Sequence, residues 1–563
     1  MPRLPFVRCA IAALLLLMAG GVVARDPVAD YPYEAPGSFV ALSYHEVRDD
    51  VRDYPDPYAV DSAALVRQFA WLRGNGYTPV SLDQIIAARG GGKALPAKAV
   101  LLTFDDAYLS FYTRVYPLLL AFNYPAVLAV VGAWIDDRHD SVLTYGEKGT
   151  VVAAQFPTWP QLREMADSGL VELASHSYDL HRGVPANPQG NLQPAATARI
   201  YDAASGDYED DTRWHERVSA DLAHSAMVLE RETGRRPRVV VWPYGSCNNE
   251  LLRMAGEWGM TIALTLDDGA NTPDVPLTAL RRTLIEHNPA LAEWVAEVRG
   301  PRHPEPVRVV EVNLDDVYDA DNTVQERKLS VLLDRIEVLK PTHVYLRATT
   351  DADGDGVADG AYFPNRHLPM RGNLFNRAAW QLASRVDVKV FAVMPVTAWR
   401  LPQDRIAEVY EDLARYNNFD GLVFDDGLQS GEMQDADTLA FTHRLALRAR
   451  AARAPLQTAR TTTRGQGMAA LAAEYDFITL IEDRAVLPPD AVTARKLVYL
   501  LHSTPASGNG RRLARRMREL QRGGALNFGY FNDDFMHDNP PLADVAPALS
   551  LRVNPLAPAQ VKP

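Results

Sequence analysis

The chain of 563 residues contains very little cysteine. It has only two cysteines, Cys9 and Cys247, and the first lies in an N-terminal segment that we expect to be removed. A framework of disulfides is therefore excluded, and the fold must be stabilised by its own hydrophobic cores. Cysteine is also missing directly after the N-terminal apolar run, where a lipoprotein signal would need one.

Positive charge is scarce as well. The chain has 58 Lys and Arg against 71 Asp and Glu, which gives a formal net charge of -13 at pH 7. A polyanion would be repelled, so nucleic acid is not expected as a partner, and a neutral or cationic polymer is easier to accommodate. Hydrophobic residues make up 47% and charged residues 23%, as in ordinary globular proteins. The length predicts two domains of a few hundred residues each.

The N-terminal apolar run, from Ala10 to Met18, is short for a membrane span. It follows Arg3 and Arg8 and precedes small residues, which is typical of a secretory signal. We predict a signal peptide over residues 1–24, cut after Ala24, with an uncleaved anchor as the alternative. The mature protein is then expected to be exported and soluble.

Short apolar segments alternate with helical patterns through the first half of the chain. They lie at residues 39–44, 99–104, 126–131, 171–176, 238–243 and 261–266. Continuous apolar strands separated by helices predict an α/β fold with a parallel sheet, as a barrel or a doubly wound sheet. Residues 182–213 interrupt this rhythm because they are polar and rich in turn formers. We predict a long loop there, over one end of the sheet.

The second half repeats the alternation after a proline-rich break at residues 300–306, so we place a linker at 299–307. Eight strand candidates follow, at residues 309–314, 342–347, 388–395, 421–426, 455–460, 476–481, 497–501 and 526–531. Strands interleaved with helices in this number predict a (β/α)8 TIM-like barrel. The predicted domains are 25–298 and 308–550, and 551–563 is a tail.

Candidate catalytic residues follow two strands of the first half. Asp105 and Asp106 end one strand, and His176 and His181 follow another. Parallel α/β folds place ligands at these carboxyl ends. One carboxylate and two imidazoles form a common set of ligands for a divalent metal, and the second aspartate could then hold water as a base. In the alternative, the aspartates cap a helix and the histidines lie in a surface loop, but their joint placement favours a metal site.

The motifs TFDD, SHSYDLH and RVVVWPYG resemble the metal-dependent polysaccharide deacetylase (NodB homology) family, over about residues 39–285. The resemblance implies a deformed (β/α) barrel, with Asp105 as the base and with Asp106, His176 and His181 as metal ligands. Zinc, nickel, cobalt or iron would suit such a set of ligands.

The same resemblance places Pro243 and Tyr244 along the substrate groove, where the backbone N–H of Tyr244 would help the metal to hold an oxyanion. Two features depart from the family pattern. The histidines are five residues apart instead of four, and the usual late histidine acid is not evident. His45, after the first strand, is similar to the acid of a permuted branch of the family, the PgaB-type poly-β-1,6-N-acetyl-D-glucosamine deacetylases. The alternatives are that His45 is a satisfied core histidine, or that His287 is the acid.

The resemblance to this branch extends through VNLDDVYDADN, YFPNRHLPM, FDGLVFDDG and FGYFNDDF, which look like its C-terminal glycoside-hydrolase-type barrel. Independently, carboxylates recur where the barrel strands end, and such barrels carry their active sites on that rim. They are Asp315, Asp316, Asp425, Asp426, Glu482, Asp483, Asp533 and Asp534.

Glycoside cleavage generally needs two carboxyl groups about 5 to 9.5 Å apart. By similarity, Asp425 and Asp426 are expected to hold the catalytic acid. We expect substrate binding by the further rim residues Asp315, Asp316, Arg347, Glu482, Asp533 and Asp534. Aromatic side chains could stack on sugars, although most aromatics in a barrel are core; the candidates are Trp380, Trp399, Tyr318, Tyr530 and Phe531. The alternative is a non-catalytic cradle, in which carboxylates pair with glucosamine ammonium groups.

The motif DADGDG, residues 351–356, is similar to the start of a calcium loop. Its twelfth position is Tyr362, where such loops have a bidentate glutamate. We therefore predict an Asp/Gly turn, with calcium as the alternative.

As a whole, the resemblance implies de-N-acetylation of poly-β-1,6-N-acetyl-D-glucosamine, a biofilm exopolysaccharide, in a Gram-negative periplasm, with an outer-membrane export porin as a partner. A deacetylase of chitin oligomers or peptidoglycan is one alternative. A polysaccharide-binding export module with an inactive metal site is the other.

Overall fold

The computed structural model describes residues 33–551 except 34, 53, 55, 137–141, 146–148, 153–154, 301–304, 426–435, 464, 466, 482–487, 489 and 505–508. The predicted signal peptide, the middle of the predicted linker, and the predicted site residues Asp426 and Glu482 lie outside the described residues. Within the described part of the chain, no helix is long and apolar enough to cross a membrane.

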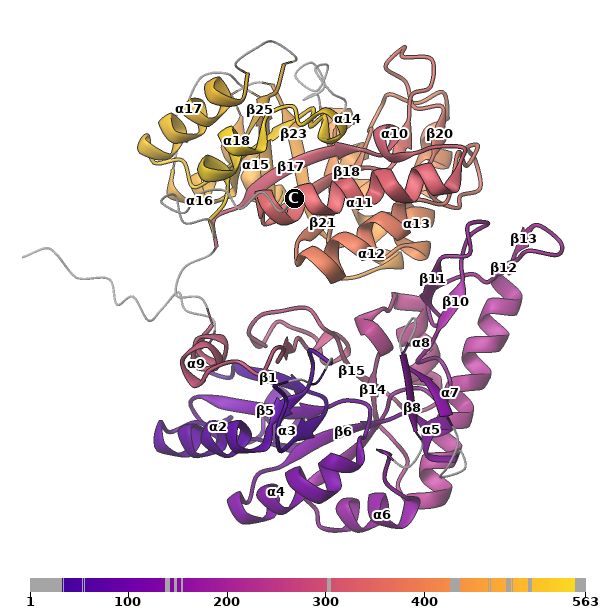
Figure 1. The fold of residues 1–563 in the computed structure, drawn as a ribbon, viewed down its shortest axis with the longest axis vertical. Helices are drawn as coiled ribbons and strands as arrows, with labels where there is room; N and C mark the ends of the chain where they lie inside the picture. Colours follow the sequence, from indigo (N-terminus) through magenta and orange to yellow (C-terminus); the bar gives the residue numbers. More distant parts are fainter. Residues whose placement is uncertain are drawn as a thin grey trace, which may run out of the picture.

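The first domain is built on a parallel sheet with the strand order β15-β14-β9-β6-β5-β1-β16 (Figure 1). The strands are β1 Phe39–Tyr44, β5 Ala99–Phe104, β6 Ala126–Val130, β9 Val171–Ser175, β14 Val239–Val241, β15 Ile262–Leu264 and β16 Thr283–Leu284, and β4 Thr78–Pro79 pairs with β5. Every residue of β1, β5 and β6 is buried, as their continuous apolar runs predict. The predicted deformed α/β barrel is confirmed as a parallel half-barrel.

Helices cover this sheet and carry the chain between its strands. They include α2 Ser62–Gly74, α3 Leu82–Arg89, α4 Tyr116–Phe122, α6 Trp159–Asp167, α7 Asp211–Thr233, α8 Asn249–Glu257 and α9 Leu291–Arg299. The crossovers put the carboxyl ends of β1, β5, β9 and β14 at one edge of the sheet, because all these strands run parallel.

The predicted long loop at residues 182–213 is wrong in part. It forms two antiparallel hairpins, β10 Gly183–Pro185 with β11 Leu192–Pro194 and β12 Tyr201–Asp202 with β13 Asp207–Tyr208, before α7 begins. Gly190 and Gly206 adopt left-handed conformations in the two turns. Small apolar residues near the first hairpin, such as Val184 and Ala195, are buried under α7 and its neighbours.

The second domain is a closed parallel barrel of eight strands, so the predicted (β/α)8 fold is confirmed, including the weakest strand candidate, the fifth. The strands are β17 Arg308–Asn313, β18 His343–Arg347, β21 Lys389–Met394, β22 Gly421–Phe424, β23 Gln457–Thr462, β24 Phe477–Ile481, β25 Leu497–His502 and β26 Asn527–Phe531. The surrounding helices include α11 Asn322–Leu339, α12 Phe375–Val386, α13 Gln403–Tyr416, α14 Ala436–Ala452, α17 Asn509–Arg522 and α18 Leu542–Leu549.

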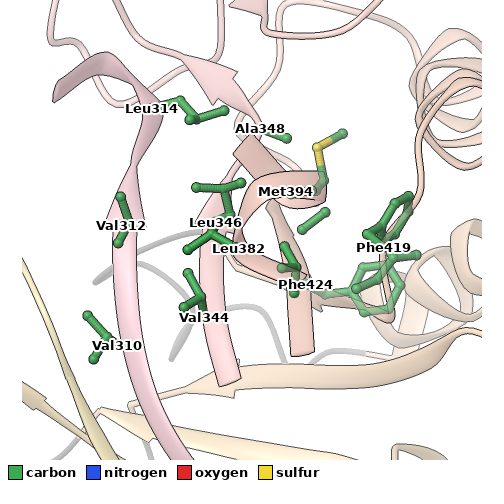
Figure 2. Packing of buried hydrophobic residues seen from close by; sticks show 14 of the residues in the cluster. Val310, Val312, Leu314, Val344, Leu346, Ala348, Leu382, Met394, Phe419 and Phe424 are labelled. Carbon is green, nitrogen blue, oxygen red and sulfur yellow. The ribbon is translucent and has the colours of Figure 1, made fainter. Parts of the chain in front are cut away.

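Side chains of the barrel strands alternate between its interior and its outer shell. Val310 and Val312 of β17 pack outward with Val344 and Leu346 of β18 against the helices (Figure 2). Val309 belongs to the separate cluster inside the barrel. Since a strand has a period of two, Glu311 lies on the same inward face as Val309.

Helix α12 lies on the side of the barrel that faces the first domain (Figure 1). Asn376 Nδ2 donates to Gln193 Oε1 of β11 at 3.2 Å, and the Asn373 side chain donates to the Ala186 carbonyl at 2.9 Å. Elsewhere, Arg453 Nη1 donates to the carbonyl of Cys247 at 2.6 Å. Polar contacts thus join the two domains at the first hairpin and at α8.

Candidate active site

Three side chains from two strand ends converge in the first domain. Asp106 follows β5, and His176 and His181 follow β9. The Nε2 atom of His176 lies 3.4 Å from Asp106 Oδ1, and that of His181 lies 3.2 Å from it. Ligand atoms held about 2.0–2.2 Å from one cation lie roughly 3 to 3.5 Å apart, so these spacings fit a single divalent ion. The structure therefore brings together the three residues predicted as metal ligands, and all three are buried.

The tautomer of His176 supports this interpretation. Its Nδ1 lies 2.7 Å from the carbonyl oxygen of Val241 in β14. A carbonyl can only accept, so Nδ1 carries a proton and Nε2 is the nitrogen that a metal would take. Burial acts to raise the pKa of Asp106, but the imidazoles of His181 and His176 hold it well below its usual value. A carboxylate oxygen and two imidazole nitrogens are thus available to a cation.

A left-handed turn separates the two aspartates. Asp105 N still donates to the carbonyl of Tyr44, as a continuation of the strand pairing, whereas Asp106 and Ala107 have φ of 68° and 51°. Residues other than glycine rarely adopt this conformation, and such strain gathers at functional sites. The turn allows neighbouring side chains, which an extended strand would send to opposite faces, to serve one site.

The loop between the histidines accounts for their unusual spacing. Ser177 has a φ of 68°, and its hydroxyl accepts the N–H of Leu180 at 3.0 Å. The carboxylate of Asp221, in α7, accepts the backbone N–H groups of Tyr178 at 2.8 Å and Asp179 at 2.7 Å. The loop folds back over α7, so His181 lies beside His176 although the two histidines are five residues apart.

Asp105 is held by a buried arginine that the sequence reasoning missed. Arg282, which precedes β16 and is 0% exposed, donates from Nη1 to Oδ1 at 2.6 Å and from Nη2 to Oδ2 at 3.0 Å. Burial acts to raise the pKa of Asp105, but the Arg282 guanidinium lowers it below its usual value. Asp105 is therefore an ionised carboxylate in a fixed orientation. A charged residue directly before the apolar TLI segment was the available signal in the sequence.

His45 follows β1 and lies half-buried beside the two aspartates. Its ring stacks on Tyr58 at 5.0 Å, and its Nδ1 has no hydrogen-bond partner among the described residues. Burial lowers its pKa, against the opposing effect of Asp105 and Asp106. A ring nitrogen without a partner in the described part of the chain is unlike a satisfied core histidine, which favours the predicted role of His45 as an acid. The alternative acid, His287, is exposed.

Tyr244 lies against the metal-ligand cluster, in the short helical turn Pro243–Gly245 after β14. Its φ is 59°, and its ring centroid lies 4.7 Å from that of His181. Pro243, the first residue of this turn, is buried, whereas Tyr244 is half-buried. The predicted substrate-groove residues therefore lie beside the predicted ligands.

A second polar cluster lies at the carboxyl end of the barrel. Arg347, at the end of β18, donates from one nitrogen to Glu311 Oε1 and to Asp425 Oδ2, at 2.9 Å each. The structure brings together the predicted residues Arg347 and Asp425. Glu311 was missed, although it is the one charged residue within the apolar VVEVNL segment. Burial raises its pKa, helped by Asp425 and opposed by Arg347.

The other predicted aspartates of the barrel rim differ in their partners and in their exposure to solvent. Asp315 accepts a hydrogen bond from Arg371 at 2.7 Å, and burial with the charge of Asp315 raises the pKa of Asp316 to about 6. Asp534 is exposed and accepts from the backbone N–H of His537 at 3.2 Å, at the start of a short helical turn.

Asp533 is enclosed. Its carboxylate accepts from Nε and Nη2 of Arg335, at 2.8 to 3.0 Å, and from the hydroxyl of Tyr530 at 2.8 Å. A side chain that is 0% exposed cannot contact a polymer, so Asp533 is a structural ion pair and its predicted role in substrate binding is wrong.

The aromatic residues predicted to stack on sugars fall into a buried group and a half-buried group. Tyr530 and Trp399 are buried, which excludes them as platforms for sugar, whereas Tyr318, Trp380 and Phe531 are half-buried.

The DADGDG motif forms a loop that is closed by its own carboxylates. Asp351 accepts the backbone N–H groups of Asp355 at 3.1 Å and Gly356 at 2.8 Å. Carboxylate oxygens of Asp351, Asp353 and Asp355 also lie within 4.8 Å of one another, but these residues are largely exposed. The hydrogen bonds are those of the predicted Asp/Gly turn.

Comparison with known proteins matches both halves of the chain. The family model "Polysaccharide deacetylase" matches residues 92–263, and "Hypothetical glycosyl hydrolase family 13" matches residues 311–406. A poly-beta-1,6-N-acetyl-D-glucosamine N-deacetylase of Escherichia coli (strain K12) is 38% identical over 449 residues. The alignment covers 74% of this chain, and the chain spans 66% of that relative's length.

Two solved structures from Bordetella bronchiseptica match the separate halves. The BpsB deacetylase domain is 51% identical, with a TM-score of 0.41, and the match covers 44% of this chain and 96% of that domain. The PgaB (BpsB) glycoside hydrolase domain is 26% identical, with a TM-score of 0.37, and the match covers 44% of this chain and 100% of that domain.

Proposed function

This chain belongs to the polysaccharide deacetylase family, in the branch of the poly-β-1,6-N-acetyl-D-glucosamine deacetylases, and on that premise we propose that it removes acetyl groups from this polysaccharide. The observation that carries the proposal is the buried cluster of Asp106, His176 and His181 beside the ionised Asp105. These residue types are what metal-assisted amide hydrolysis requires.

Asp106, His176 and His181 would hold the metal. A divalent cation bound there would supply Lewis acidity, which makes water more acidic and an amide carbonyl more electrophilic. Zinc, nickel, cobalt and iron all suit one carboxylate and two imidazoles. The hydrogen bond from His176 Nδ1 to Val241 fixes one of these ligands before any metal binds.

Asp105 acts as the base. Arg282 holds both of its oxygens, which keeps the carboxylate ionised and fixes its direction, so that it can take a proton from the attacking water. The backbone N–H of Tyr244 stabilises the negative charge that develops on the carbonyl oxygen. His45, which lies beside the two aspartates, gives a proton to the departing amine.

Acetate release from defined oligomers tests this function. The full-length mature protein, loaded with each candidate metal in turn, is incubated with β-1,6-linked N-acetylglucosamine oligomers and with chitin oligomers. We expect acetate from the β-1,6 series and none from an Asp106→Ala variant. If acetate came from chitin oligomers alone, chitin would replace the β-1,6 polymer as the substrate. If wild type and variant released equally little acetate while binding the polymer alike, the protein would be a polysaccharide-binding module.

We further propose that the barrel binds and cleaves the partly de-acetylated chain. The cluster of Glu311, Arg347 and Asp425 supports this, because two carboxyl groups flank one site at the carboxyl end of the barrel. Mass spectrometry of partly de-acetylated oligomers should show shorter products with wild type and unchanged lengths with Asp425→Asn, while both release acetate equally. Unchanged lengths with wild type would leave a binding cradle.

The cellular setting that we propose is the periplasm of a Gram-negative cell, where the polymer passes to an outer-membrane export porin. Fractionation of cells that express the full chain tests the location: the protein should appear in the periplasmic fraction. Co-purification with the outer-membrane fraction only when the porin is present would support the partner.

A further inference from the structure

We propose that Trp380, on helix α12 of the barrel domain, forms a sugar-binding subsite of the metal centre in the first domain. The subsite would hold the sugar next to the one that loses its acetyl group, so it rests on the proposed deacetylase function. The two domains would then bind one polymer jointly, and the barrel would take part in de-acetylation.

A row of aromatic rings connects the metal-ligand cluster to the second domain. The ring of Tyr244 lies 4.7 Å from that of His181 and 6.0 Å from the indole of Trp380, with an interplanar angle of 86° for the second pair. Tyr244 and Trp380 are both half-buried, so each keeps part of its surface open to solvent. A tryptophan from the barrel domain is thus one ring contact away from a predicted metal ligand.

The position of Trp380 is fixed by hydrogen bonds to the hairpin that follows His181. Hairpin β10–β11 begins two residues after that histidine. Asn376 of α12 donates to Gln193 at 3.2 Å, and Asn373, just before α12, donates to the carbonyl of Ala186. Residues four apart lie on one face of a helix, so Asn376 and Trp380 face the first domain together. The loop that presents His181 therefore also supports the helix that presents Trp380.

The chemistry of an indole suits this polymer. The C–H face of a pyranose packs on an aromatic ring, and an unacetylated glucosamine carries an ammonium group that the indole face attracts. Both the acetylated and the de-acetylated neighbour of the reacting sugar can therefore be held by the same ring. The negative net charge of the chain is compatible with the same cationic product.

Steady-state kinetics on β-1,6-linked N-acetylglucosamine oligomers of two and five units test the subsite. Trp380→Ala should raise KM for the pentamer about fivefold to tenfold, the loss expected for one aromatic contact, and leave kcat unchanged. Trp380→Phe should restore most of the affinity, because a ring remains. Arg385→Ala, which changes an exposed side chain of the same helix and keeps the indole, is the matched control and should leave KM unchanged.

Binding separates this proposal from the proposed function. Calorimetric titration of the pentamer into metal-loaded Asp105→Asn protein, with and without Trp380→Ala, reads affinity without turnover. Weaker binding in the Trp380→Ala background supports the subsite even if wild type releases no acetate. Equal binding, an unchanged KM for Trp380→Ala, or the same loss for Trp380→Phe and Arg385→Ala as for Trp380→Ala would overturn it.

Discussion

Arg282 and Asp105 form the most informative ion pair of the first domain. Arg282→Met removes the guanidinium and keeps an apolar chain of similar length, so the Asp105 carboxylate stays buried, 3% exposed, without its cation. Removing one partner of a buried pair costs about 3 to 5 kcal/mol. For a domain of this size, each kcal/mol shifts the melting temperature by roughly 2 to 4 °C, so we expect the first domain to melt roughly 10 °C lower. Scanning calorimetry of the full chain measures this shift.

The double variant Arg282→Met with Asp105→Asn gives the decisive comparison. Asp105→Asn alone leaves a buried guanidinium unpaired and should also destabilise the domain. Both changes together leave no uncompensated charge, so the double variant should be more stable than Arg282→Met alone. The contrary result is a loss of stability in the double variant that equals the sum of the two single losses to within about 0.5 kcal/mol. In that case the two residues act independently, and the pairing argument fails.

Two further predictions concern stability. Burial raises the pKa of Asp221 to about 6, so the folded protein favours the protonated carboxyl group. The stability that this group contributes is therefore full below its pKa in the unfolded chain, about 4. It falls by about 3 kcal/mol as the pH rises through 6. Asp221→Asn should flatten this pH dependence in urea unfolding between pH 4 and 7, and parallel curves for the two proteins would refute it. Gly529→Ala should destabilise the barrel by about 1 to 3 kcal/mol or more. The reason is that the added Cβ would lie 2.1 Å from the carbonyl oxygen of Val309. Gly256→Ala, on α8 with open space around the new Cβ, is the control and should be neutral or slightly stabilising by calorimetry.

The sequence was most informative where one physical requirement dominates. A strand that is buried on both faces must be continuously apolar, so the predicted segments 39–44 and 99–104 coincide with β1 and β5. The same rule located the eight barrel strands. It was less useful at residues 182–213, where turn formers predict a loop but pairs of short strands form across Gly190 and Gly206.

The site was predictable as far as ligand chemistry goes, and no further. Asp106, His176 and His181 could be selected because metal ligands are few in type and lie at strand ends. For Arg282 and Glu311, a charge beside or within an apolar segment was the available signal. It could not identify their partners, because an ion pair between distant segments leaves no local spacing to detect. Asp533 shows the opposite error. It was selected for substrate binding because it is a carboxylate at a strand end, but its partner is Arg335 of helix α11.

The measurement that tests the central claim most directly compares two neighbouring isosteric substitutions. Asp106→Asn and Asp105→Asn proteins are dialysed against the activating metal, and metal content and acetate release are measured on the same samples. Asp106→Asn should lose both the metal and activity, whereas Asp105→Asn should keep about one metal ion per chain and lose turnover. Metal retention by Asp106→Asn, or full turnover by Asp105→Asn, would contradict the division of roles between the two aspartates.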